Sequence, residues 1–131
     1  MGLETKVRIS DGIAILDLDG NLLCSRETDT LRETLLGLFG QGHTRMLLNL
    51  EKVLHADSGG LGDLVAAYAA VTRRGGAVKL LRPQARILAM LRMTHIDSLV
   101  EICEDERAAV TSFGPAAKPR GMAAPSDLFN G

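Results

Sequence analysis

A single serine stands where a predicted strand meets a predicted helix, in the run Asp57-Ser58-Gly59-Gly60-Leu61-Gly62. The apolar residues before this run indicate a strand, and residues 63–71 have the composition of a buried helix. A hydroxyl at such a junction is held by backbone on both sides, and the free N–H groups of the helix start favour negative charge. We therefore predict that Ser58 is a phosphorylation site and that the rest of the chain presents it.

The sequence on either side of this run alternates between strand and helix patterns. Strands are expected at residues 5–10, 13–19, 46–50, 77–81 and 99–103, and helices at residues 25–39, from the serine run to residue 74, from Pro83 onwards and at residues 104–113. The first two strands form a hairpin, Gly20-Asn21 ends the second, and right-handed crossovers make the later strands largely parallel. The predicted fold is α/β: a mixed β-sheet with an N-terminal hairpin and about four helices packed against it.

Length and composition fit one globular domain followed by a tail. The 131 residues are 46% hydrophobic, enough for a core, and we expect a domain over residues 1–113 and a flexible tail over residues 114–131, rich in Gly, Pro and Ala. A net charge of −1 without a basic stripe argues against nucleic-acid binding, and no apolar run approaches the roughly 20 residues of a membrane helix. Because Cys24 and Cys103 belong to no paired motif and no signal peptide is evident, we expect a soluble cytoplasmic protein.

The serine run has a recognisable context. It is preceded by Asn49-Leu50-Glu51-Lys52-Val53 and continues as Asp-Ser-x-Gly-Leu-Gly. This combination resembles the signature loop of STAS domains, and most closely that of the bacterial anti-sigma factor antagonists. The similarity covers roughly residues 5–112 and includes further matching positions: Leu18-x-Gly20-x-Leu22, Arg73-Arg74-Gly75-Gly76, Val78-Lys79-Leu80-Leu81 and Pro83.

In that family the serine after the aspartate is phosphorylated by an anti-sigma factor that is itself a serine kinase. The unphosphorylated domain binds the kinase and frees the sigma factor, and a serine phosphatase resets the modified form. The resemblance implies a non-enzymatic anti-sigma factor antagonist with Ser58 as acceptor and no cofactor of its own, since the partner binds ATP. The expected partner-binding residues are Asp57, Ser58, Gly59, Gly60, Leu61, Gly62, Asp63 and Ala66. Gly59 stands where the family often has Ser or Thr, so a second acceptor is lost, and the sequence leaves the oligomeric state open.

Two other functions remain open. The first is a non-phosphorylated STAS subunit of a larger assembly, such as a stressosome or a lipid or anion transport complex, in which Ser58 only caps the helix. The second is an enzyme, because Asp17-Leu18-Asp19-Gly20-Asn21 resembles the first motif of haloacid dehalogenase-like phosphatases, with Asp17 as nucleophile and Asp19 as acid/base. A simpler interpretation places both aspartates on the wet face of a strand, with Gly20 as its turn.

The sequence gives little indication of a hydrolase triad or of a metal site. His55, Asp57 and Ser58 supply the groups of a hydrolase triad, but no Gly-x-Ser-x-Gly elbow is present, and solvated loop residues account for them better. The histidines and cysteines lack the short paired spacings of a zinc site. We expect no metal, and we expect Cys103 to pack as a small hydrophobic residue in the last strand.

Overall fold

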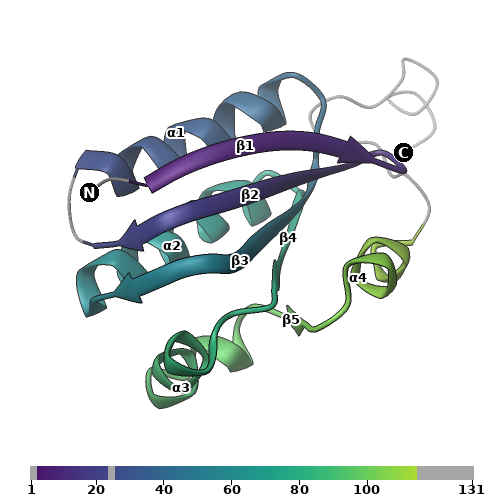
Figure 1. Cartoon of the computed structure of the whole chain (residues 1–131). Helices are drawn as coiled ribbons and strands as arrows, with labels where there is room; N and C mark the ends of the chain where they lie inside the picture. Colours follow the sequence, from purple (N-terminus) through teal and green to yellow (C-terminus); the bar gives the residue numbers. More distant parts are fainter. Residues whose placement is uncertain (1–2, 24–25, 115–131) are drawn as a thin grey trace, which may run out of the picture.

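The fold is a single five-stranded mixed sheet with helices on both faces (Figure 1). The structure is a computed structural model. It describes residues 3–23 and 26–114, without the side chains of residues 26–30. The strands are β1 (Leu3–Ser10), β2 (Ile13–Leu22), β3 (Arg45–Ala56), β4 (Ala77–Leu81) and β5 (Ile102–Cys103). The helices are α1 (Arg26–Gly40), α2 (Ser58–Thr72), α3 (Ala85–Met93) and α4 (Glu106–Ser112), with a 3-10 turn at Ile96–Ser98.

The strands lie in the order β1-β2-β3-β4-β5. β1 and β2 form the expected antiparallel hairpin, and β2, β3, β4 and β5 run parallel to one another. The α/β fold with a mixed sheet and an N-terminal hairpin is therefore confirmed, and the parallel order follows from the crossover helices.

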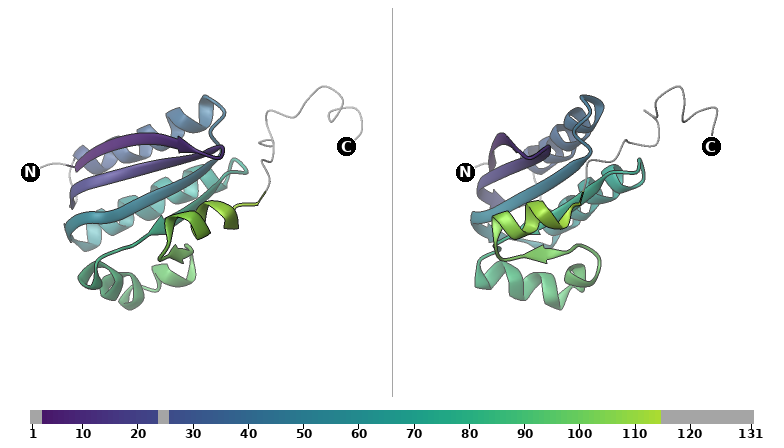
Figure 2. Two further views of the ribbon diagram at one scale, coloured as in Figure 1. Left: turned by 45° about the vertical axis from the view of Figure 1, so that its right-hand side comes forward. Right: turned by 90° about the vertical axis from the view of Figure 1, so that its right-hand side faces the viewer.

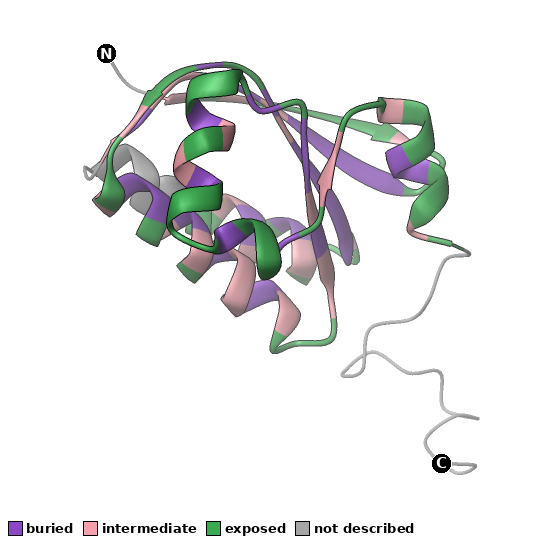
Figure 3. Cartoon of the chain, turned by 90° about the horizontal axis from the view of Figure 1, so that it is seen from below, coloured by how far each residue is buried: buried purple, intermediate pink, exposed green. Residues whose placement is uncertain are grey.

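Each face of the sheet has its own apolar cluster. The larger cluster joins the inner side chains of the sheet to α1, α2 and α3, and includes Leu16, Leu35 and Leu64, all at most 1% exposed. The smaller cluster lies on the opposite face, where α4 packs Ala109 and Val110 against it. Figure 2 shows α4 by itself on its side of the sheet, and Figure 3 shows burial concentrated between the layers. Much of the face beside α4 therefore stays open to solvent.

An ion-pair network ties α4 to the first hairpin. Arg8 donates from Nε and Nη2 to the two carboxylate oxygens of Asp17, at 2.6 and 3.0 Å, and from Nη1 to Glu106 of α4, at 2.9 Å. Asn49 of β3 donates to Asp17 at 2.8 Å. The guanidinium fork thus bridges two carboxylates that are 89 residues apart in the sequence (106 − 17).

Several predicted boundaries were wrong. Gly20-Asn21 does not end β2, because Gly20 adopts a φ of +125° inside the strand, where the pairing with β3 shifts register, and β2 continues to Leu22. β3 likewise runs on from residue 50 to Ala56, paired with this extension. The last strand is only Ile102–Cys103, and Pro83 precedes the N-cap Gln84, so it lies outside the first turn of α3.

Candidate functional site

The aspartate before the serine caps α2. Asp57 has extended backbone angles (φ −117°, ψ 174°), and its Oδ1 accepts a hydrogen bond from the backbone N–H of Gly60 at 2.6 Å. Its carbonyl oxygen accepts the N–H of Leu61 at 3.0 Å, which starts the helical hydrogen bonds. An aspartate at this position satisfies one of the free N–H groups of the first turn.

Ser58 is the first residue of α2 and is exposed. The alternative that Ser58 serves as the helix cap is wrong, because the neighbouring carboxylate of Asp57 occupies that role. The hydroxyl therefore lies at the positive end of the helix dipole without being needed for the cap. Solvent access and nearby N–H groups make this a position where a negatively charged group can be accommodated.

Gly60 brings α2 into direct backbone contact with the end of β2. A Cβ atom on Gly60 would lie 1.9 Å from the carbonyl oxygen of Leu22 and 2.4 Å from its carbonyl carbon. The same Leu22 oxygen accepts the N–H of Asp57 at 3.1 Å. Gly60 and Leu61 are both buried, so they fix the position of the loop and face away from solvent. The contact between Gly60 and the Leu22 carbonyl was not predicted from the sequence, because no local sequence pattern indicates that two segments this far apart in the chain come together.

The other predicted contact residues divide by exposure. Gly62 and Ala66 are exposed and follow Ser58 at intervals of four, so the three form one stripe along α2. Gly59 and Asp63 are half-buried beside this stripe. The stripe carries no charged side chain, which is unusual on the outer face of a helix. It offers a partner close access to the backbone next to the serine.

The end of β3 and the start of α3 flank the serine run. The Nδ1 atom of His55 lies 3.1 Å from Nη1 of Arg86, and Gln84 donates from Nε2 to the carbonyl of Glu51 at 2.8 Å. Leu54 is 53% exposed, a large value for a leucine on a central strand. With His55 directed to Arg86 and Asp57 to the amide of Gly60, the hydrolase-triad arrangement is not formed.

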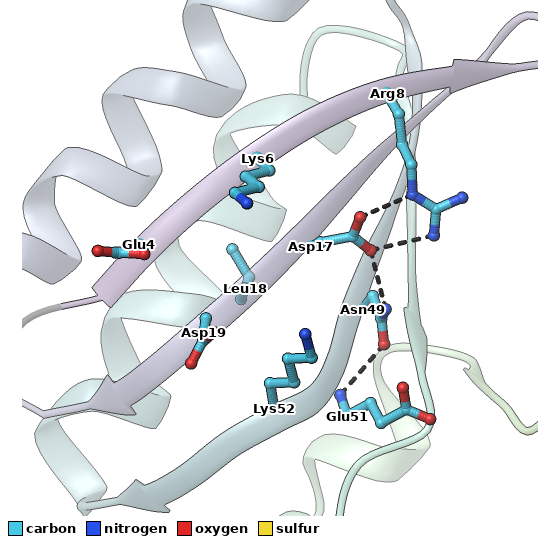
Figure 4. A pocket seen from close by; sticks show the side chains of 9 residues that line it. All are labelled: Glu4, Lys6, Arg8, Asp17, Leu18, Asp19, Asn49, Glu51 and Lys52. Carbon is cyan, nitrogen blue, oxygen red and sulfur yellow. Dashed lines mark hydrogen bonds and ion pairs between the residues drawn. The ribbon is translucent and has the colours of Figure 1, made fainter.

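Asp17 and Asp19 lie on the wet face of β2, as the simpler interpretation predicted. Asp17 sits in the middle of the strand, and its bonds to Arg8 hold the pKa of its carboxyl below the usual range, with a smaller contribution from Asn49. Both aspartates line a hollow of about 360 Å³. The side chains around it carry charges of both signs (Figure 4). A carboxylate bound in this way by a guanidinium is a poor phosphoryl nucleophile. The hollow includes none of residues 57–66.

The described part of the chain contains neither a cluster of metal ligands nor a cysteine with a lowered thiol pKa. No three His, Cys, Asp or Glu side chains there could hold a metal ion together, and no helix there could cross a membrane. Cys103 is half-buried against the smaller apolar cluster, as expected, and burial together with Glu101 raises the pKa of its thiol. Cys24 and the predicted tail beyond Gly114 lie outside the described residues.

The fold and the site together define a class: a small α/β domain that presents a serine at the carboxyl edge of a mixed sheet. Residues 4–109 match the model of the STAS domain, and the chain belongs to that family. No curated protein sequence gives a significant match to the chain.

Solved structures show the same fold at low sequence identity. A Thermotoga maritima protein described as an anti-sigma factor antagonist is 22% identical, with a TM-score of 0.74 over 82% of this chain and 92% of the other. An anti-sigma factor antagonist from Mycobacterium paratuberculosis is 18% identical, with a TM-score of 0.70 over 85% and 93%. Bacillus SpoIIAA in its phosphorylated form is 17% identical, with a TM-score of 0.63 over 84% and 99%.

Proposed function

We propose that this protein is an anti-sigma factor antagonist whose binding to an anti-sigma factor is switched by phosphorylation of Ser58. The observation that carries the proposal lies at the start of α2, where Asp57 is the N-cap and the exposed residue Ser58 is not needed for capping. The STAS fold and its similarity to structures described as anti-sigma factor antagonists support the same role. On this proposal the partner is the serine kinase and binds ATP, and a serine phosphatase restores the unmodified form.

The switch acts on the interface and leaves the fold intact. A phosphate on Ser58 adds nearly two negative charges at the N-terminus of α2, where the helix dipole is favourable and partly offsets the repulsion from Asp57. The neighbouring contact surface, Gly62 and Ala66, has no charge to balance it. A partner packed against that stripe would have to desolvate the phosphate, so the modified protein is released.

The test compares four proteins in a pull-down from native lysate: wild type, Ser58→Ala, Ser58→Asp and the control Ser98→Asp. Ser98 is an exposed serine in the 3-10 turn and is not one of the proposed contact residues, so its variant adds the same charge to a different element. Wild type, Ser58→Ala and Ser98→Asp should hold a kinase-like partner, and Ser58→Asp should lose it. Incubation of the captured complex with ATP, followed by intact mass spectrometry, should add one phosphate to wild type and none to Ser58→Ala.

A second candidate is a non-phosphorylated STAS subunit of a larger assembly. The uncharged stripe along α2 favours it as well, because such a surface suits permanent burial in an interface. In that case all four proteins hold the same partners and no phosphate is added in the presence of ATP. This result would refute the phosphorylation switch and would be consistent with α2 as an interaction surface.

A further inference from the structure

The outer edge of β1 is the longest unpaired strand edge in the described sheet. Among residues 3–23 and 26–114, β1 pairs only with β2 and ends the strand order, whereas β5 at the other end contains two residues. Figures 1 and 2 show the outer side of β1 without a neighbouring strand. Val7 and Ile9 on this strand are 44% and 53% exposed, high values for β-branched residues in a sheet. Such an edge can pair with another strand unless its side chains prevent it.

The charges of β1 decide what can pair with it. Glu4, Lys6 and Arg8 alternate along the open face, and Arg8 is fully engaged with Asp17 and Glu106. Within the described residues, neither Glu4 nor Lys6 takes part in an ion pair. Two opposite charges two residues apart are therefore available at the free edge.

Glu4 is also poorly matched inside its own sheet. It lies directly opposite Asp19 on β2. Like charges at directly opposed positions of an antiparallel pair are destabilising. A cation placed on the other side of Glu4 would offset this repulsion, and the free edge is where such a cation has room.

A second copy of β1 supplies an unengaged cation, without opposing like charges, in one register. In an antiparallel pair related by a two-fold axis, three residues near the middle of the strand can serve as the centre: Thr5, Lys6 or Val7. Centring on Lys6 opposes two lysines at the axis and offers Glu4 only Arg8, which is already engaged with Asp17 and Glu106, and centring on Val7 opposes Lys6 to Arg8 twice. Centring on Thr5 places Glu4 opposite Lys6 on both sides of the axis, with no like charges opposed.

We propose that two copies of this chain associate through their β1 edges, antiparallel and centred on Thr5, to form one continuous sheet from the five strands of each copy. Leu3 of each copy faces Val7 of the other on the helix side, and the two Thr5 side chains meet at the axis. The paired segment is short, so the interface is of the small class and associates weakly. Association falls as salt rises, because the charge pairs are exposed. The dimer uses neither the Ser58 run nor α2, and its test is independent of the switch.

The experiment is sedimentation velocity of the full chain over roughly 10–500 µM, the range in which small interfaces associate. Wild type should show a concentration-dependent monomer–dimer equilibrium. Glu4→Lys and Lys6→Glu should each weaken it by about tenfold, because each opposes two pairs of like charges.

An equimolar mixture of the two variants should dimerise like wild type. One variant carries lysine at both charged positions and the other carries glutamate at both, so every opposed pair in the mixed dimer joins opposite charges. Asp97→Lys, an exposed change in the 3-10 turn that precedes β5 at the other end of the strand order, is the control and should behave like wild type.

Three results would overturn the proposal. If wild type stays monomeric up to the highest concentration, the dimer is refuted, and a strand of another protein becomes the alternative partner of the β1 edge. A dimer that the two charge variants leave unchanged would place the interface elsewhere. A dimer that Lys6→Glu strengthens, without recovery in the mixture, would exclude the register centred on Thr5. Circular dichroism of each variant checks that the fold is retained, so a loss of association is assigned to the edge.

Discussion

Replacement of Gly60 by alanine tests whether the junction is held against the end of β2. The added Cβ would lie 1.9 Å from the Leu22 carbonyl oxygen, and ordinary van der Waals contact begins near 3.4 Å, so the backbones must separate by about 1.5 Å (3.4 − 1.9). That movement breaks the hydrogen bond from the Asp57 N–H to the Leu22 carbonyl, at 3.1 Å, whereas the bond from the Gly60 N–H to Asp57 lies within the segment that moves and is kept.

The magnitude follows from three contributions. Overpacking costs about 1–3 kcal/mol, the lost hydrogen bond to Leu22 contributes about 1 kcal/mol, and the better helix propensity of alanine returns about 1 kcal/mol. We expect Gly60→Ala to lower the free energy of unfolding by about 2 kcal/mol. The measurement is urea unfolding followed by circular dichroism, with the slope of the transition unchanged and its midpoint lowered.

Gly62→Ala is the matched control for Gly60→Ala. It lies on the same turn of α2, is exposed, and has no atom within 4 Å of its added Cβ. It should raise the free energy of unfolding by about 0.5–1 kcal/mol through helix propensity and a smaller unfolded ensemble. If Gly60→Ala unfolds at the same urea concentration as Gly62→Ala, α2 does not contact β2 as described, and the argument for the junction fails.

The remaining predictions concern the cap and the ion pairs. Asp57→Ala should lower the free energy of unfolding by about 1 kcal/mol, whereas Ser58→Ala should change it by less than about 0.5 kcal/mol. Urea unfolding of both variants measures the two changes. Equal losses of stability would contradict the assignment of the cap to Asp57. Arg8→Leu should cost about 1 kcal/mol at neutral pH, because its carboxylate partners are about a third exposed. Since Arg8 lowers the pKa of both Asp17 and Glu106 in the folded protein, this stabilisation is complete above their unfolded pKa values near 4 and is lost as pH falls through the lowered values. Urea unfolding in steps from pH 7 to 3 should therefore show the two proteins converging in acid, and a difference independent of pH would contradict the network.

Local patterns located most of the elements. The strand at residues 77–81 has the bounds of β4, because an apolar run between glycines and a proline reports a short buried strand without help from the rest of the chain. The helix that follows the serine run was also anticipated, because residues 63–71 have the composition of a buried helix and Gly75-Gly76 follow it as a stop. Two of the boundaries that failed lie at Gly20 and at the end of β3, where pairing between β2 and β3 overrides the turn signal of glycine and asparagine.

The sequence by itself determined the α/β architecture, the STAS resemblance and the choice of Ser58, because alternation, periodicity and a short loop motif are properties of neighbouring residues. The choice of Asp57 over Ser58 as the cap is local, between two neighbouring residues, and the structure decided it. Only the tertiary structure explained Gly60, since that glycine is required by a carbonyl on a strand far away in the sequence. The same holds for the bridge from Arg8 to Glu106 and for the free edge of β1. These features depend on which distant segments become neighbours, and packing decides that after the local elements have formed.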